Sequence, residues 1–183
     1  MLEINFSPFP ELETNRLILR SLDMRDVQAI YKLRSNPEVM KHINRPLIKS
    51  IEEAEAWVEL VTGNVVNNIG ITWAMCLKTD PEVNFGNIGL WRIEPENYRA
   101  EVGYMMLPAY QKKGLMFEAL KTVTEFGISN LKLHSIEARI DPLNTASSKL
   151  LKRAGFVREA YFIENIFWNG NFEDTAIYSF VKK

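Results

Sequence analysis

The stretch Gln111-Lys112-Lys113-Gly114-Leu115-Met116 is the most informative part of this chain, because it joins a predicted strand to a predicted helix through a short basic turn. Residues 102–107 before it form an apolar run that is typical of a β-strand. Residues 116–126 after it carry apolar side chains at helical spacing. The first N–H groups of a helix have no partner within the helix and lie at the positive end of its dipole. Strand, turn and helix in this order therefore predict an anion site formed by backbone.

The composition of the turn indicates which kind of anion it binds. Gly114 has no Cβ to collide with a ligand that approaches the backbone. Lys112 and Lys113 add positive charge at the same place, although a solvated surface pair is the alternative interpretation. We therefore expect a ligand that carries a diphosphate. The chain has no GxxxxGKS/T run of a P-loop, and Gly86-Asn87-Ile88-Gly89 has the wrong spacing for a GxGxxG dinucleotide fingerprint.

Length and composition predict a single domain, residues 1–183, of an ordinary globular protein. Hydrophobic residues are 46% and charged residues 25% of the chain. The net charge of -1 argues against nucleic-acid binding, and no apolar stretch reaches the roughly 20 residues that span a membrane. The lone Cys76 allows no internal disulfide and suits a reducing compartment, so we expect a cytoplasmic protein. Only His42 and His134 accompany it, and no metal site is expected.

The pattern along the chain predicts a mixed α+β sheet covered by helices. Asp23, Ser50 and Asn144 are expected N-caps, with Glu53 completing a capping box, and Gly155 is an expected helix stop. Strands are expected at residues 14–20, 69–77, 87–93, 99–107, 133–140, 161–168 and 174–181, and helices at residues 24–34, 51–61, 116–126 and 145–154.

Several runs in fixed order resemble one family. They are Leu12 to Arg20, Ala100-Glu101-Val102-Gly103-Tyr104, the run from Tyr110 to Ala119, and Asn144-Thr145-Ala146-Ser147 followed by Ala154-Gly155-Phe156. Together they resemble the GNAT superfamily of acyl-CoA-dependent N-acetyltransferases, and within it the RimJ/RimL-like branch of ribosomal-protein N-terminal acetyltransferases. The likeness covers about residues 12–180.

The resemblance implies a fold and an activity. The fold is a central, mostly antiparallel, strongly twisted sheet of about seven strands, splayed in the middle and flanked by helices. The activity is transfer of the acetyl group of acetyl-CoA to a primary amine, by direct attack in a ternary complex. The amine is a protein N-terminus or a small molecule, and the protein is a monomer or homodimer.

The resemblance also implies how acetyl-CoA is bound. The backbone of Met105, Met106 and Leu107 would follow the pantetheine arm, although these residues can also be core residues. Asn144 would reach the pantetheine amides, and this role is compatible with an N-cap. Met116 departs from the usual Gly or Ala, which is tolerable if its side chain turns into the core. The pyrophosphate would meet the N–H groups of Gln111, Lys112, Lys113, Gly114, Leu115 and Met116.

The chemistry needs a neutral amine, and so a proton acceptor. A protein α-amine has a reference pKa of about 8 and a lysine one of about 10.4, so an α-amine needs less help. Glu101 opens the central strand and is the first candidate for the base. Glu137 on the neighbouring strand is the second, and an ordinary exposed glutamate is the alternative for both.

The leaving thiolate also needs a proton. Many members of the family supply it from a tyrosine four residues before the Gly-Phe pair, where this chain has Leu151. Ser147 is a candidate substitute, with a second capping group as its alternative role. The missing tyrosine also keeps open a non-catalytic CoA-binding or interaction module. A purely structural domain is a third alternative.

The acceptor pocket is expected between the first two helices and the C-terminal tail. An acidic pocket would favour polyamines, and Glu52, Glu53 and Glu55 form an acidic cluster in this region, although such a run is usually a solvated helix face. The expected pocket includes Arg34, His42, Trp57, Tyr161 and Trp168.

Overall fold

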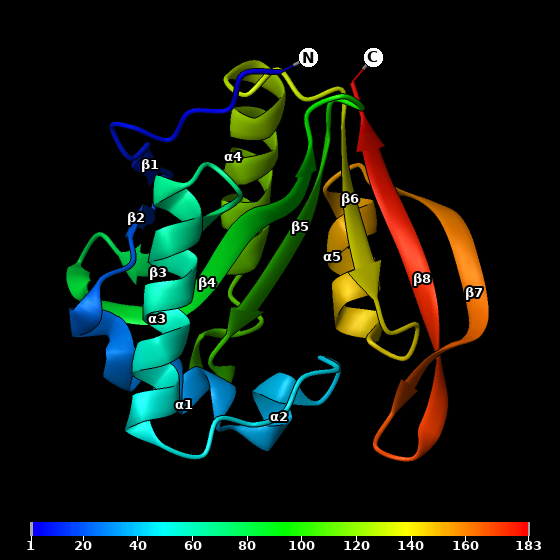
Figure 1. The fold of residues 1–183 in the computed structure, drawn as a ribbon, viewed down its shortest axis with the longest axis horizontal. Coiled ribbons are helices and arrows are strands. Elements are labelled where there is room, and N and C mark those ends of the chain that lie inside the picture. The colour runs from blue at the N-terminus through cyan, green and yellow to red at the C-terminus, as the bar shows by residue number, and fades with distance from the viewer. Residues whose placement is uncertain (1, 183) are drawn as a thin grey trace.

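A computed structural model describes residues 2–182 and shows one eight-stranded sheet with helices on both faces (Figure 1). The strand order is β1-β2-β3-β4-β5-β6-β8-β7. The strands are β1 (Leu12–Glu13), β2 (Leu17–Ser21), β3 (Ile71–Leu77), β4 (Asp80–Glu94), β5 (Arg99–Met106), β6 (Ser135–Ile140), β7 (Val157–Trp168) and β8 (Asn171–Val181). The helices are α1 (Val27–Arg34), α2 (Pro37–Met40), α3 (Ile51–Val66), α4 (Leu115–Ser129) and α5 (Thr145–Arg153), with 3₁₀ turns η1 (Met24–Asp26) and η2 (Pro108–Tyr110).

The predicted mixed α+β sheet is confirmed, with eight strands in place of about seven. The difference lies at the start of the chain, where residues 14–20 were expected to form one strand. Leu12 and Glu13 instead pair antiparallel with Leu19 and Ile18 across a turn. The hydroxyl of Thr14 holds that turn, because it accepts the N–H of Leu17 at 2.9 Å.

The expected caps are present, with two local differences. Asp23 begins the 3₁₀ turn η1 before α1, and Asn36 both follows α1 and N-caps α2. Ser50 caps α3 by accepting the N–H of Glu53, but the Glu53 carboxylate accepts from the N–H of Lys49, one residue earlier than a capping box requires.

The sheet separates two hydrophobic clusters, one under α1 and α3 and one under α4 and α5. On the α4 side, Ala119, Leu120 and Val123 are fully buried, as their helical spacing predicts. On the other side, Ile30 and Leu33 of α1 pack with Ala54 and Val58 of α3. Burial of these apolar faces fixes both helix layers to the sheet.

The sheet is splayed in its middle. β5 and β6 run parallel, but they pair only from Arg99 with Ser135 to Glu101 with Glu137. β5 continues to Met106 with β4, and β6 continues to Ile140 with β8. The two central strands therefore part beyond Glu101, as the family resemblance implies.

A buried ion pair fixes α1 to the sheet. Arg20 of β2 donates two hydrogen bonds to Asp26, at 2.8 and 2.9 Å, and both side chains are almost completely buried. Asp26 also accepts the N–H of Asp23. The carboxylate thus sets the start of α1, and with it the position of the residues at the far end of that helix.

We expect Asp26→Asn to lower the free energy of unfolding by about 3 kcal/mol, because Arg20 keeps its buried charge and loses its counter-charge. Urea denaturation followed by circular dichroism measures the change. Glu82→Gln is the matched control, because it breaks the exposed Arg25–Glu82 pair, and it should leave the midpoint almost unchanged. Equal losses in the two variants would contradict a structural role for the buried pair.

Candidate active site

The parting of β5 and β6 opens into a cavity of about 860 Å³. Its wall takes residues from both strands, from α1 and α3, from the loop after α2 and from the β7–β8 hairpin. Arg34, His42, Trp57 and Trp168 line it, as expected of the acceptor pocket. Tyr161 does not, but it donates a hydrogen bond to Asp174, which does.

Glu101 lies in this wall and is 9% exposed. Its Oε2 accepts a hydrogen bond from Arg92 at 2.8 Å and lies 3.6 Å from Nε of Arg139. Its Oε1 accepts no hydrogen bond from any of residues 2–182. One carboxylate oxygen is thus held by arginines, and the other is available to a water or an amine.

Glu137 has a different environment. Its Oε1 accepts from Nε of Arg139 at 2.8 Å, and its Oε2 lies 3.7 Å from Arg99. It is buried but is not part of the cavity wall. Both oxygens are engaged, so the geometry favours Glu101 over Glu137 as a proton acceptor.

A pair of hydroxyl groups lies on the same cavity wall. Oγ of Ser147 in α5 and the hydroxyl of Tyr104 in β5 are 2.7 Å apart. Burial raises the pKa of Tyr104 to about 12, so this phenol stays protonated at neutral pH, and either hydroxyl can donate to the other. The Ser147 hydroxyl is therefore not a second helix cap.

Tyr104 was missed as a functional residue by the sequence pattern, which placed it in the opening run of β5. The signal was present, because Tyr104 carries the only hydroxyl on the strand face that it shares with Ala100, Val102 and Met106. Leu151, where the family tyrosine was expected, is fully buried in the hydrophobic core. A phenol at that position would have to displace core side chains.

The basic turn has the conformation that a backbone anion site requires. Gly114 N-caps α4 in the left-handed region, at φ 77°, and Lys112 has φ 60°. The N–H groups of residues 112–117 donate to no acceptor in the described part of the chain. The side chain of Gln111 donates to the carbonyl of Met106, which ties the turn to the end of β5.

The predicted binding residues around this turn lie in three different environments. Lys112 and Lys113 are exposed, and Nζ of Lys113 lies 5.6 Å from the centre of the Tyr110 ring. Met116 is 7% exposed and packs in the core, so its departure from Gly or Ala is accommodated. Asn144 caps α5 through Oδ1, which accepts the N–H of Ser147 at 3.0 Å.

The cavity brings together only part of the predicted site. Met105, Asn144, Ser147 and Glu101 line it. The turn at residues 111–116, together with Met106 and Leu107, lies outside its wall. The structure thus separates a cavity, where an acetyl group and an amine can meet, from a surface turn suited to phosphates.

The carboxylates of the cavity wall are Glu101, Asp141 and Asp174. Asp141 pairs with His42 at 2.6 Å, and Asp174 accepts from Tyr161 and from the N–H of Glu164. The acidic cluster at Glu52, Glu53 and Glu55 is not part of the wall, which agrees with a solvated helix face.

Arg34 is the least compensated charge in this wall. Its guanidinium lies over the ring of Trp57, 4.9 Å from the ring centre. Its buried Nε has no hydrogen-bond partner, and no carboxylate within residues 2–182 pairs with it. Burial and the nearby positive charge of Arg45 lower its pKa below the ordinary value.

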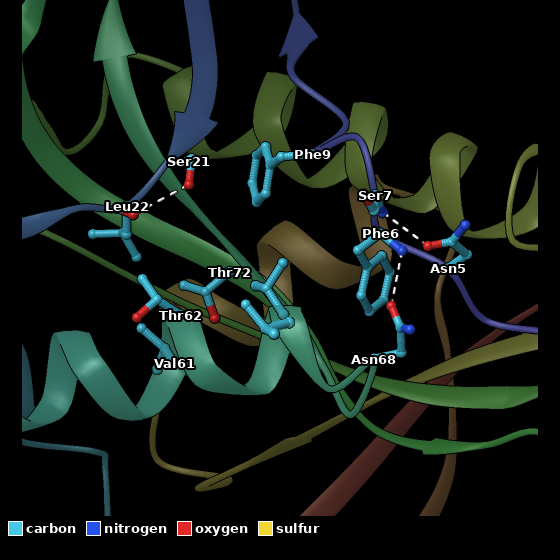
Figure 2. Close-up of a pocket in the computed structure, with 12 residues that line it drawn as sticks. Asn5, Phe6, Ser7, Phe9, Ser21, Leu22, Val61, Thr62, Asn68 and Thr72 are labelled. Carbon is cyan, nitrogen blue, oxygen red and sulfur yellow. Dashed lines mark hydrogen bonds between the residues drawn. The ribbon is translucent and has the colours of Figure 1, made fainter.

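A second cavity of about 510 Å³ lies between the N-terminal segment and α3 (Figure 2). Figure 2 shows the N–H of Phe6 bonded to the side chain of Asn68, which closes one side. None of its lining residues carries a titratable side chain. This cavity therefore lacks the groups that acyl transfer needs.

The comparison with known families agrees with this geometry. Residues 16–157 match the acetyltransferase (GNAT) domain family, and the chain belongs to that family. Uncharacterized N-acetyltransferase YoaA of Bacillus subtilis (strain 168) is 34% identical over 174 residues, 95% of this chain and 98% of the relative. The protein is therefore an acetyl-CoA-dependent N-acetyltransferase with the GNAT fold. No helix among residues 2–182 is long and apolar enough to cross a membrane.

Two further similarities differ in their acceptors. Spermidine N(1)-acetyltransferase of Vibrio cholerae serotype O1 is 26% identical over 163 residues, 87% of this chain and 90% of the relative. The structure of RimL, a ribosomal L7/L12 α-N-protein acetyltransferase in complex with coenzyme A, superposes with a TM-score of 0.85 at 19% identity, covering 94% of this chain and 98% of that one. The second likeness concerns the fold alone.

Proposed function

We propose that the cavity between β5 and β6 is where an amine attacks the acetyl group of acetyl-CoA directly, in a ternary complex. One observation carries the proposal: Glu101, with one free carboxylate oxygen, and the Tyr104–Ser147 hydroxyl pair line the same cavity where the two strands part. A proton acceptor and a proton donor are the two groups that amine acetylation requires.

Three features of the chain suit coenzyme A. The unpartnered N–H groups of residues 112–117 and the two lysines of the turn fit a pyrophosphate. Beyond Glu101, β5 has no strand partner on the side of β6. The N–H of Leu107 is bonded to the carbonyl of Phe85 on the β4 side, so the backbone at Met106, which alternates with it, is open to the amides of a pantetheine arm. Asn144 uses only Oδ1 as a cap, which leaves its amide nitrogen for the same arm.

The proton transfers can then be assigned to residues of this chain. Glu101 takes a proton from the ammonium group through Oε1, directly or through a water, and the neutral nitrogen attacks the acetyl carbon. As the carbon–sulfur bond breaks, the Tyr104 hydroxyl donates to the leaving sulfur and recovers a proton through Ser147. The attacking nitrogen loses two protons in all. One balances the proton that the leaving sulfur takes up, and the other is released, so each turnover releases one proton.

The acceptor class stays open between a protein N-terminus and a small molecule. One proposal is a RimJ/RimL-like enzyme that acetylates a protein N-terminus. The other is an enzyme that acetylates a polyamine or another small amine. The relatives include a ribosomal-protein-serine acetyltransferase and a spermidine acetyltransferase. A cytoplasmic location fits Cys76, a free thiol whose pKa burial raises to about 11. A non-catalytic CoA-binding module is the second candidate function, and the buried Leu151 is the observation that favours it.

Thiol release from acetyl-CoA, measured with a panel of N-terminal peptides, polyamines and small amines, tests the function. We expect turnover with at least one acceptor class and no turnover without amine. CoA alone should raise the melting temperature in either case. Stabilisation by CoA together with no turnover on any amine would refute the enzyme and favour the binding module.

For the phosphate turn, we expect Gly114→Ala to weaken CoA binding about tenfold, because its Cβ would intrude where the backbone approaches the ligand. Gly170→Ala in the β7–β8 turn is the matched control, since Gly170 also has a positive φ, 84°, with no atom near its missing Cβ. In both variants, the left-handed backbone conformation of the new alanine costs about 1–2 kcal/mol. Calorimetric titration with CoA should separate them, and equal affinities would contradict the assignment.

For the base, we expect Glu101→Gln to lower kcat by about 10²–10⁴ and to change the shape of the pH–rate profile. Glu137→Gln is the matched control, because it makes the same change in a buried, arginine-paired carboxylate outside the cavity wall. Its profile should keep the shape seen in the wild type. An unchanged profile for Glu101→Gln would exclude this residue as the base.

A further inference from the structure

We propose that the acceptor amine also carries an oxyanion, a carboxylate or a phosphate, which binds Arg34 at the end of α1. The inference rests on the proposed function, since it names the chemistry of the acceptor for the same cavity. It makes the preferred acceptor a zwitterion, with its ammonium group at Glu101 and its anionic group at Arg34.

The charge balance of the cavity wall singles out Arg34. Arg92 pairs with Glu101 at 2.8 Å, and Arg139 pairs with Glu137 at the same distance. Arg34 lines the same cavity, and no carboxylate of residues 2–182 lies within ion-pair distance of it. Arg45 also lines the cavity without a carboxylate partner, but it is exposed, whereas Arg34 is held in place by packing on Trp57 with its donors free for a ligand.

Partial burial makes this arrangement costly without a ligand, because Arg34 is half-buried and its Nε is fully buried. A buried guanidinium loses solvation that only a counter-charge or hydrogen bonds restore. Nε of Arg34 is buried and donates to nothing. The C-terminal end of the α1 dipole offsets a small part of the cost, whereas Arg45 adds a like charge. An oxyanion would supply both the missing charge and the missing acceptor atoms.

The fold holds Arg34 in a fixed orientation. The guanidinium lies on the face of Trp57 from α3, a contact that leaves the edge of its planar fork for hydrogen bonds. Its backbone carbonyl accepts the N–H of Ile48 at 3.1 Å, which places the loop carrying Arg45 beside it. Two arginines at one end of the cavity suit a bidentate oxyanion.

The same wall is poorly suited to a polyamine. Polyamines carry several ammonium groups, and the hydrogen bonds of Asp141 with His42 and of Asp174 with Tyr161 and the N–H of Glu164 already occupy oxygens of these two carboxylates. The free Oε1 of Glu101 can serve one ammonium group, the one that reacts. A second cation would meet Arg34 and Arg45 and be repelled.

Matched acceptor pairs test the inference. We expect kcat/KM at least tenfold higher for β-alanine than for β-alaninamide, or for O-phosphoethanolamine than for ethanolamine. A dipeptide amide with Asp rather than Asn after the N-terminal residue extends the test to protein acceptors. The pair of acceptors that shows the preference identifies the anion as a free carboxylate, a phosphate or a side-chain carboxylate. Better use of spermidine or of the neutral members would overturn the proposal.

Variants then connect the preference to the residue. Arg34→Gln should abolish the preference, chiefly through KM of the anionic acceptor, and Arg34→Lys should keep part of it. Lys32→Gln is the control, because Lys32 is exposed on the same helix and its loss removes the same charge. If Arg34→Gln fails to fold, the acceptor preference of Arg34→Lys is compared with that of the wild type, and a reduced preference supports the role of Arg34. An unchanged preference in the folded variant would assign the selectivity elsewhere.

Calorimetry separates this inference from the proposed function. O-phosphoethanolamine and β-alanine are titrated into CoA-saturated protein, so that the phosphate turn is already occupied. Binding that Arg34→Gln weakens tenfold and Lys32→Gln leaves unchanged supports the anion site even if no amine is acetylated. No binding of either probe to the wild type would overturn the site, whatever the turnover results show.

Discussion

The cavity depends on one constraint, the early end of the parallel pairing between β5 and β6. After Glu101 and Glu137 the two strands no longer share hydrogen bonds, and each continues with its outer neighbour. Beyond that point Tyr104 spans the gap by its contact with Ser147 of α5. Backbone groups that a continuous sheet would have paired are left for a ligand. Both the cavity and its polar lining follow from this divergence.

The cavity also needs its wall to be held from outside. Glycine allows one close approach here, because a Cβ at Gly103 would lie 2.2 Å from the ring of Trp91. The His42–Asp141 contact joins the loop after α2 to the end of β6, and so links the two halves of the chain across the cavity. The buried Arg20–Asp26 pair fixes α1 from the other side. These interactions determine where the arginines and Trp57 stand relative to Glu101.

Local sequence signals predicted the parts of this structure that local physics determines. The helix after Gly114, its apolar stripe, the Asn144 cap and the β7–β8 hairpin each follow from spacing and turn chemistry within a few residues. The β1–β2 turn, which a backbone hydrogen bond from Thr14 to Leu17 and the Thr14 hydroxyl both hold, was missed because the pattern from Thr14 to Arg20 favours one continuous strand. Tyr104 was missed because its partner, Ser147, is 43 positions away. Contacts of that kind are set by topology, which a single sequence shows only through resemblance.

The distribution of charge is where topology adds most to the functional argument. In the sequence, Glu52, Glu53 and Glu55 suggest an acidic acceptor site, while Arg34 is one residue at the end of an ordinary helix. In the fold, the acidic run does not line the cavity, whereas Arg34 lines it without a carboxylate partner. Arg92 and Arg139 are paired with Glu101 and Glu137, whereas Arg34 has no carboxylate partner within residues 2–182. A cavity lined by both a proton acceptor and an arginine without a carboxylate partner offers complementary groups to a substrate whose two charges are opposite in sign.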